Sequence, residues 1–286
     1  MKPDFFIIGL GQIGGSLALA LRKRKMARKI SGLDLAYRSE YSTILDDYIP
    51  ELEVGVKKAD FIVLCSPVEE IKKQIRKIGP LLNENQILFD TGSTKKEIVR
   101  EMENFPDKCM VGGHPMAGTV KMGEKAWNPE LFLGKPFFLC RVQSRRSSKG
   151  LKQVREIIVS LGAQPIEISA ERHDQNVALT SQLPYLLSLA LFSLFLKKSN
   201  QQKRINSFLA TGFLGATRLC LTPPTMGQSM LRSNKENVLQ LADEFIREFK
   251  FLEKCLQEER GEDFLFLVNA EAEKRRKRYE KAFPGN

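Results

Sequence analysis

The residue best suited to acid–base chemistry is His114, one of only two histidines in a chain of 286 residues. Its ordinary pKa lies near neutral pH, so the ring can accept a proton from a hydroxyl whose carbon loses a hydride. Ser93 can hydrogen-bond His114 or a substrate hydroxyl. Its alternative role is a helix cap, but Thr94 and Glu97 already match the capping box of the following helix, which leaves Ser93 freer. We therefore predict His114 as a catalytic base with Ser93 as its partner. The alternative is a structural histidine placed before a proline.

Several other polar residues are candidates for binding a ligand or for joining parts of the fold. Lys95 and Lys121 suit a phosphate or carboxylate partner or a solvated surface, and the sequence leaves both interpretations open. Arg218 lies among apolar residues, and a nearly buried arginine usually pairs with a carboxylate of the protein or of a substrate. His173 and Asp174 open a helical region, where a helix-start or interdomain hydrogen bond is favoured over catalysis.

A nucleotide-binding turn at the N-terminus would bind the cofactor that accepts this hydride. An apolar strand at residues 5–8 runs into the pattern G-x-G-x-x-G, and a helix is expected over residues 14–24. Gly9 permits the tight turn, Gly11 lets the backbone approach a pyrophosphate, and Gly14 lets helix and strand pack closely. The helix amides would face the phosphates. Asp34 is placed to hydrogen-bond a ribose 2′-hydroxyl, which favours NAD over NADP, although Arg38 can accept a 2′-phosphate.

Alternating segments in the first half of the chain predict an α/β fold with a doubly wound, mostly parallel Rossmann-type sheet. Strands are expected at residues 5–8, 30–33, 61–65, 86–89, 109–111, 137–140 and 165–168, and helices at residues 14–24, 69–78, 95–103 and 149–161. Ligands bind such sheets at the carboxyl ends of the strands, so the segments that follow the third, fourth and fifth strands should converge on the nicotinamide. The predicted cofactor contacts are Gly9, Gly11, Gln12, Ile13, Gly14, Asp34, Cys65, Ser66 and Pro67.

The second half of the chain shows no convincing strand. Apolar residues recur at helical spacing in residues 174–196, 203–214, 237–255 and 263–279. We therefore predict a dinucleotide-binding domain over residues 1–168 and an all-helical domain over residues 169–286.

Composition argues against several other classes of protein. Five cysteines without C-x-x-C spacing argue against a disulfide framework or a metal site and for a reducing, cytoplasmic compartment. The net charge of +11 is scattered apart from the basic run at residues 274–278, and no nucleic-acid-binding motif accompanies it. The chain enters a strand at once, so no signal peptide is expected. The apolar stretch at residues 183–196 is too short to span a membrane and fits a buried or dimer-interface helix better.

Together these motifs resemble the prephenate dehydrogenase family, and the resemblance covers nearly the whole chain. The matching motifs are the glycine turn at 9–14 with Asp34, C-S-P at 65–67, G-S-T-K at 92–95, G-H-P-x-A-G-T at 113–119, H-D at 173–174, L-P at 183–184, T-R at 217–218 and N-K-E-N at 234–237. The family implies a Rossmann domain followed by a helical domain that forms a homodimer. It also implies NAD-dependent oxidative decarboxylation of prephenate to 4-hydroxyphenylpyruvate, or of arogenate, on the route to tyrosine.

The resemblance also implies roles for particular residues. His114 would deprotonate the 4-hydroxyl of the substrate, Ser93 would assist it, and Arg218 would anchor the side-chain carboxylate. A small anionic substrate agrees with the basic balance of the chain. Lys121 is a further predicted substrate contact.

The departures from the family pattern fall mainly in the expected substrate pocket. Val120 stands where an acid is usual, and the element S-H-L-P-H reads S-Q-L-P-Y at residues 181–185, with Gln182 and Tyr185 in place of both histidines. Gly215 replaces another acid, and residues 222–229 lack the tryptophan, the arginine and both acids of the family's S-D-P-x-x-W-R-D stretch. We predict that Gln182 and Tyr185 contact the substrate. The pocket is either rebuilt for the same substrate, which the retained catalytic residues favour, or serves a different hydroxy acid.

Two alternatives beyond prephenate and arogenate stay open at this stage. One is an NAD-dependent dehydrogenase of another small hydroxy acid, of the type that carries a catalytic lysine on a long helix of the second domain. Lys197 and Lys198, the nearby candidates, instead look like the charged end of an apolar helix. The other is a non-catalytic NAD-binding sensor, which His114 and Ser93 argue against.

Overall fold

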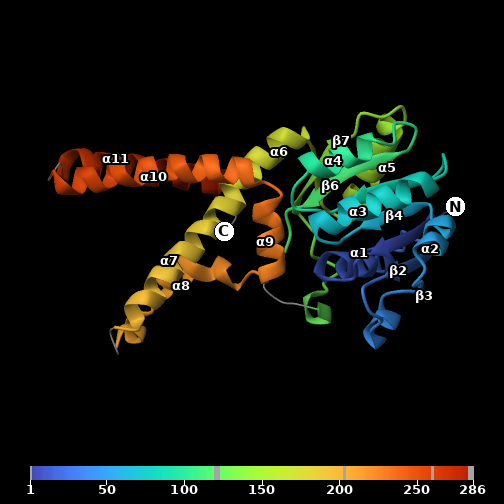
Figure 1. Cartoon of the computed structure of the whole chain (residues 1–286), viewed down its shortest axis with the longest axis horizontal. Coiled ribbons are helices and arrows are strands. Elements are labelled where there is room, and N and C mark those ends of the chain that lie inside the picture. Colours follow the sequence, from blue (N-terminus) through green and yellow to red (C-terminus); the bar gives the residue numbers. More distant parts are fainter. Residues whose placement is uncertain (1, 119–122, 202–203, 259–260, 283–286) are drawn as a thin grey trace. The chain divides into compact units, whose positions relative to one another are not determined.

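The computed structural model describes residues 2–118, 123–201, 204–258 and 261–282 (Figure 1). The chain forms two compact units, Met1–Asn237 and Val238–Asn286, and each is described by itself. The first unit holds an eight-stranded sheet, the helices that cover it and the helices α6 to α9. The second holds most of α10 (Lys235–Gln257) and α11 (Gly261–Ala282).

The sheet has the strand order β3-β2-β1-β4-β5-β6-β7-β8. Neighbouring strands run parallel except β6 and β7, which pair antiparallel with His114 opposite Phe138. This confirms the predicted doubly wound, mostly parallel sheet. The strands are β1 (Asp4–Ile8), β2 (Lys29–Leu33), β3 (Asp47–Tyr48), β4 (Phe61–Leu64), β5 (Ile87–Asp90), β6 (Met110–Pro115), β7 (Pro136–Arg141) and β8 (Gln164–Glu167).

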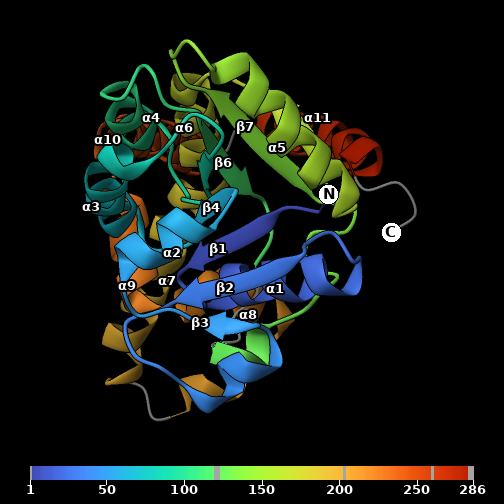
Figure 2. The ribbon, with the colours of Figure 1, turned by 90° about the vertical axis from the view of Figure 1, so that its right-hand side faces the viewer.

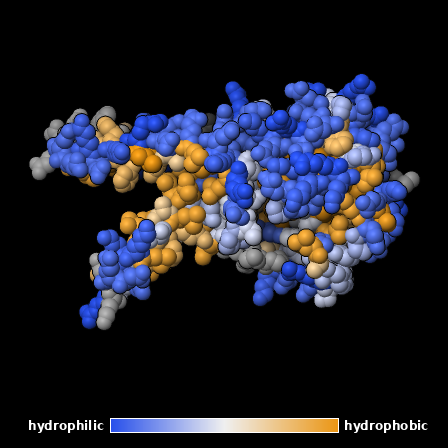
Figure 3. All heavy atoms as spheres, viewed as in Figure 1, coloured by the Kyte–Doolittle hydropathy of each residue, from blue (hydrophilic) through white to orange (hydrophobic). Residues whose placement is uncertain are grey.

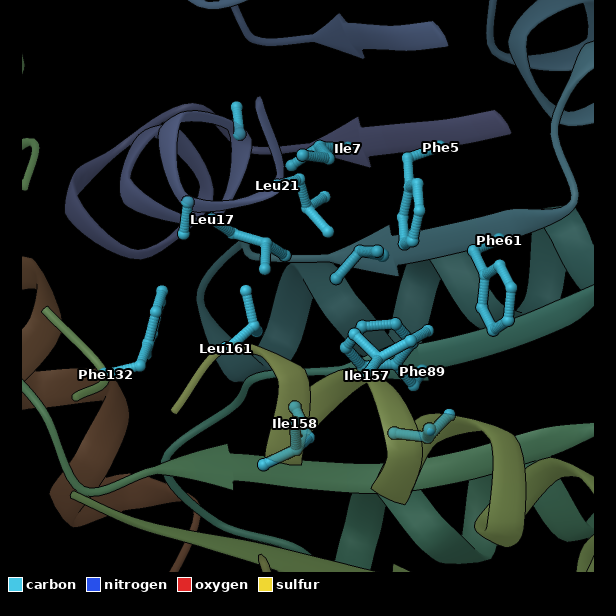
Figure 4. Packing of buried hydrophobic residues seen from close by; sticks show 14 of the residues in the cluster. Phe5, Ile7, Leu17, Leu21, Phe61, Phe89, Phe132, Ile157, Ile158 and Leu161 are labelled. Atoms are coloured by element: carbon cyan, nitrogen blue, oxygen red, sulfur yellow. The ribbon is translucent and has the colours of Figure 1, made fainter. Parts of the chain in front are cut away.

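Helices cover both faces of the sheet, so its inner strands are apolar on both sides (Figure 2). Because side chains alternate along a strand, Phe5 of β1 faces α1 and α5, and its neighbour Phe6 faces the other helical layer. Figure 4 shows the first of these cores, where Leu21 of α1 packs near Phe5. Burial of each such side chain stabilises the fold by about 1.5–3 kcal/mol. The helices are α1 (Gln12–Lys23), α2 (Leu52–Lys58), α3 (Val68–Ile78), α4 (Lys96–Glu103) and α5 (Ser147–Ser160).

The helical part of the first unit follows β8 directly. It consists of α6 (Ala170–Val177), a π-helical turn (Ala178–Gln182), α7 (Leu183–Ser199), α8 (Thr211–Thr217), a 3₁₀ turn (Arg218–Leu221) and α9 (Pro224–Arg232). The described residues after β8 contain no strand, as predicted. The sequence did not indicate the π-helical turn, which widens the helix between α6 and α7 and is a feature often found at functional sites.

One helical run in the described residues, Ala170–Ser199, is long and apolar enough to cross a membrane by length and composition alone. The prediction that its apolar stretch is too short was therefore wrong, because α6, the π-helical turn and α7 form one continuous run. Buried core helices and interface helices pass the same test. Apolar residues gather over α7, where Leu189, Leu191, Leu194 and Leu196 are exposed within the single chain (Figure 3).

Candidate active site

The N-terminal glycines form a turn with room for a phosphate group. Gly9 has a φ of +92°, in the left-handed region that favours glycine, and its Cβ would lie 2.7 Å from the carbonyl oxygen of Cys65. A Cβ on Gly14 would lie 1.9 Å from the carbonyl oxygen of Gly9. In contrast, nothing lies within 4 Å of the position that a Cβ of Gly11 would take. Gln12 and Ile13 then begin α1, whose N-terminus has no side-chain cap and leaves its amides available to an anion.

Asp34 lies at the end of β2, next to this turn. Its carboxylate accepts hydrogen bonds from the amides of Leu10 (3.0 Å) and Leu35 (2.7 Å) and from the Tyr41 hydroxyl (2.8 Å). The indole N–H of Trp127 donates to the carbonyls of Leu10 (3.1 Å) and Gly11 (3.2 Å). A cleft of about 430 Å³ opens here, lined by Leu10, Gly11, Asp34, Arg38, Glu40, Tyr41, Glu124, Lys125 and Trp127. The glycine turn, the uncapped helix and the fixed carboxylate together fit a dinucleotide with a free ribose 2′-hydroxyl.

The carboxyl ends of β4, β5 and β6 come together, as predicted. The amide of Cys65 donates to the carbonyl of Ile8 (2.7 Å), so the turn after β4 lies beside the glycine turn. In the same turn, Ser66 Oγ accepts a hydrogen bond from the Gln74 amide (3.0 Å), and Pro67 precedes α3. Burial raises the pKa of the Cys65 thiol to about 12, so this residue is a neutral neighbour of the site and not a nucleophile.

Lys95 is neither solvated nor a ligand-binding cation. It is fully buried, and its ammonium contacts the buried carboxylate of Asp90 and the carbonyl oxygen of Gly113. The amides of Gly92 (2.7 Å) and Gly113 (3.0 Å) also donate to Asp90. Of the two interpretations that the sequence left open, a solvated Lys95 was therefore wrong, and a carboxylate partner is present, but it is Asp90 of the protein itself. This ion pair ties the end of β5 to the strand that carries His114.

His114 is hydrogen-bonded to the other histidine of the chain. Its Nδ1 lies 2.8 Å from Nε2 of His173, whose Nδ1 lies 2.7 Å from Oδ1 of Asp174. His173 and Asp174 are both 1% exposed and lie on α6. The three residues form a relay from a buried carboxylate to the ring of His114. The sequence favoured a helix-start or interdomain bond for His173 and Asp174, and it missed that this bond reaches the predicted base.

The hydrogen bonds of the relay define the proton arrangement in which His114 is a base. The carboxylate of Asp174 can only accept, so neutral His173 carries its proton on Nδ1 and offers Nε2 as an acceptor. His114 then donates from Nδ1, and its Nε2, which has no partner among the described residues, is free to accept a proton. Burial, followed by His173 and the charge of Lys95, holds the pKa of His114 well below its usual value and favours the neutral ring.

Asp174 also caps α4. Its Oδ1 accepts from the amide of Lys95 (2.7 Å) and its Oδ2 from the amide of Lys96 (2.9 Å). The capping box predicted from the sequence is therefore absent. Thr94 donates instead to Ser233 (2.9 Å), and Glu97 pairs with Lys72 (2.6 Å). A carboxylate 78 residues further along the chain takes the place of the local cap.

The other predicted site residues lie in different surroundings. Ser93 is half-buried, and its side chain makes no hydrogen bond within the described residues, so the partner of His114 Nδ1 is His173 and not Ser93. Arg218 is exposed within the single chain rather than nearly buried. Gln182 is buried and accepts a hydrogen bond from Asn234 (2.7 Å), and Tyr185 is buried beside Gly227 of α9. Lys121 lies outside the described residues.

Fold, cofactor cradle and histidine relay define a dinucleotide-dependent oxidoreductase, and comparison with known proteins identifies its family. Residues 17–167 match the model for the prephenate dehydrogenase nucleotide-binding domain, and residues 169–270 match that for the prephenate dehydrogenase dimerization domain. The prephenate dehydrogenase of Bacillus subtilis is 29% identical over 270 residues, which cover 92% of this chain and 72% of that protein. The cyclohexadienyl dehydrogenase of Zymomonas mobilis is 29% identical over 278 residues, 94% of each chain.

Solved structures of related enzymes have the same fold as this chain. The prephenate dehydrogenase of Aquifex aeolicus in complex with hydroxyphenyl propionate and NAD⁺ has a TM-score of 0.89 and 28% identity, over 97% of this chain and 98% of that one. Synechocystis arogenate dehydrogenase has the same fold, with a TM-score of 0.80 and 24% identity over 96% of this chain and 99% of that one. The chain belongs to the prephenate dehydrogenase family. It is an NAD-dependent oxidoreductase of that type, with a helical dimerisation domain after the nucleotide-binding domain.

Proposed function

We propose that His114 is the base of this enzyme in the oxidative decarboxylation of prephenate to 4-hydroxyphenylpyruvate. The observation that carries the proposal is the 2.8 Å hydrogen bond from His114 Nδ1 to His173. That bond leaves His114 Nε2 as the nitrogen that can accept the proton of the substrate's 4-hydroxyl. In this family of reactions NAD⁺ supplies the acceptor for the hydride that leaves C4 of the substrate.

The relay would stabilise the charge that forms on His114. When Nε2 takes the hydroxyl proton, the imidazolium is held by the hydrogen bond to His173 and, through it, by the carboxylate of Asp174. The substrate oxygen becomes a carbonyl, and loss of the ring carboxylate as carbon dioxide restores the aromatic ring. The phenolate oxygen then takes the proton back from His114, so the base returns to its starting state.

The buried cation near the site supports this assignment. Burial, then His173, and last the charge of Lys95, which contacts the carbonyl of Gly113 next to His114, all disfavour a protonated ring. A base must be neutral before the reaction begins, so these effects keep the ring of His114 unprotonated and able to accept a proton at working pH. Ser93 is proposed to hydrogen-bond the substrate hydroxyl, since the side chain is half-buried and unpaired among the described residues.

The remaining predicted residues complete the proposal. Arg218 and Lys121 both bind carboxylates of a small anionic substrate. Tyr185 lines the pocket for the same substrate. The chain acts as a cytoplasmic homodimer in tyrosine biosynthesis, without nucleic acid or membrane as a partner. The exposed apolar residues of α7 then belong to the dimer interface. We keep residue 168 as the boundary between the two functional domains.

The test is NADH formation by the purified protein with NAD⁺ and either prephenate or arogenate. We expect turnover of prephenate, and loss of turnover but not of NAD binding in His114→Ala. Arg218→Ala should raise the KM for prephenate far more than the KM for NAD. Equal loss of turnover and NAD binding in His114→Ala would contradict its role as the base. NAD binding without turnover of either substrate would favour a different hydroxy acid or a sensor.

A further inference from the structure

The side-chain amide of Gln182 is the least explained polar group near the relay. Gln182 is 1% exposed, and its Nε2 has no hydrogen-bond partner among the described residues. A buried donor without an acceptor costs about 1–3 kcal/mol. Native structures rarely keep such a group unless a water or a ligand supplies the missing acceptor. The orientation of this amide therefore decides what kind of ligand it can bind.

A chain of amides determines that orientation. The backbone carbonyl of Asp174 can only accept, and it lies 2.7 Å from Asn234 Nδ2. Asn234 therefore presents its NH₂ group on this side, and the same Nδ2 lies 2.7 Å from Gln182. The Oδ1 of Asn234 accepts from Asn237 (2.7 Å), which holds Asn234 in the same orientation. Gln182 must meet an NH₂ group with its oxygen, so its own NH₂ points away from Asn234 as a fixed donor.

The same contacts place this donor in one hydrogen-bonded unit with the base. Asn234 joins Gln182 to the backbone of Asp174, and the side chain of Asp174 joins His173 to His114. Gln182 ends the π-helical turn that follows α6, the helix that carries the relay. Gln182 and His114 therefore belong to one hydrogen-bonded network, which runs through Asn234, Asp174 and His173.

We propose that Gln182 Nε2 donates a hydrogen bond to the keto oxygen of the substrate's side chain and so makes the enzyme selective for the keto acid over the amino acid. This inference rests on the proposed function and adds the substrate class. A neutral amide suits a neutral carbonyl acceptor, because the pair buries no net charge. The side-chain carboxylate is left to Arg218, which is a cation. An ammonium group at the same position would face another donor and lose its hydration without gaining an acceptor.

The test is equilibrium binding of three ligands that share a 4-hydroxyphenyl ring and a side-chain carboxylate. They are 4-hydroxyphenylpyruvate with a keto group, tyrosine with an ammonium group, and 4-hydroxyphenylpropionate with neither. Calorimetry in the presence of NAD⁺ measures each Kd for the full-length protein. We expect wild type to bind 4-hydroxyphenylpyruvate about tenfold or more tighter than tyrosine, since one satisfied donor is worth about that factor.

The decisive variant is Gln182→Glu, which keeps an oxygen for Asn234 and replaces the donor by a carboxylate oxygen. We expect the Kd ratio of tyrosine to 4-hydroxyphenylpyruvate to fall by about tenfold to a hundredfold, with the propionate affected least. Gln201→Glu adds the same charge at an exposed position and should leave the ratio unchanged. Thermal unfolding of both variants shows whether the fold is intact, and Gln182→His, which restores a ring donor, should recover part of the ratio.

Two results would overturn the inference. If Gln182→Glu weakens all three ligands by the same factor, the amide does not distinguish the keto group. If it changes none of them, the amide faces only a water molecule. Neither result depends on turnover, so failure of the inference is distinct from failure of the proposed function, which is judged by NADH formation in wild type.

Discussion

Replacement of Lys95 by methionine should destabilise the protein far more than the same replacement of an exposed lysine. The variant leaves the carboxyl of Asp90 at 0% exposure with two amide donors and no cation. If that carboxyl stays ionised, the loss is about 3–5 kcal/mol. If it takes up a proton instead, the cost is about 1.4 kcal/mol for each pH unit above its unfolded-state pKa of about 3.9, close to 5 kcal/mol at pH 7.5. Both routes give a loss that is a large part of the stability of an ordinary domain.

The pH dependence gives this prediction a second, independent check. Burial raises the pKa of Asp90, and without Lys95 nothing but the two amides opposes that rise. The folded variant then binds a proton that the unfolded chain releases, so its stability falls as pH rises above about 4. The loss relative to wild type should shrink from at most about 5 kcal/mol at pH 7.5 to at most about 1.5 kcal/mol at pH 5, because burial already raises the pKa of Asp90 in wild type.

Guanidinium unfolding at the two pH values measures both effects. Lys96→Met is the matched control, because the Lys96 side chain is exposed, and it should stay within about 0.5 kcal/mol of wild type. Asp90→Asn combined with Lys95→Met removes both charges and should recover more than half of the loss. A loss below about 1 kcal/mol for Lys95→Met, with no pH dependence, would refute the buried ion pair as the role of this lysine.

Three further outcomes are expected. His173→Phe should lower kcat by about 10²–10⁴ with little change in NAD affinity, because the base loses its orienting partner. His173→Gln keeps an acceptor oxygen for His114 and should therefore lose less activity. Equal losses of kcat in the two variants would argue against the relay. Gly11→Ala should unfold like wild type but bind NAD at least about tenfold more weakly, since its methyl enters open space, whereas Gly14→Ala should lower the Tm because its Cβ would lie 1.9 Å from a carbonyl oxygen. Because the pKa of His114 is lowered and its neutral form is the base, the acid limb of kcat/KM for prephenate should lie below pH 6.5, and a limb above that value would contradict the assignment.

The sequence predicted those features that follow from local pattern. The glycine turn, the acid at the end of β2 and the alternation of apolar strands and helices all depend on residues close together in the chain. These patterns predicted the doubly wound sheet, the glycine turn and the convergence of three strand ends around His114. The short elements β3 and α2 and the helix α9 were missed, because two to nine residues carry too little periodicity to be recognised.

Most of the errors at the site share one physical cause, which is pairing across long stretches of sequence. Thr94 and Glu97 match a capping box, yet the amides of α4 are satisfied by Asp174, and Thr94 bonds a serine 139 residues away. Lys95 differs, because its partner Asp90 lies only five residues away. No sequence pattern marks Asp90 as a partner, so the sequence left a solvated surface and a phosphate or carboxylate partner of Lys95 equally open. The bond between His114 and His173 spans 59 residues. The presence of only two histidines in the chain was the one signal that could have suggested it.

The double use of the Asp174 carboxylate has a consequence for recombining this enzyme with its relatives. The start of α4 and the orientation of the base both depend on one side chain that lies beyond residue 168. A chimera joined there would inherit its nucleotide-binding half from one parent and the cap of that half from the other. Such exchanges should succeed only between parents that share the carboxylate and the histidine before it, so these two positions set which halves are interchangeable.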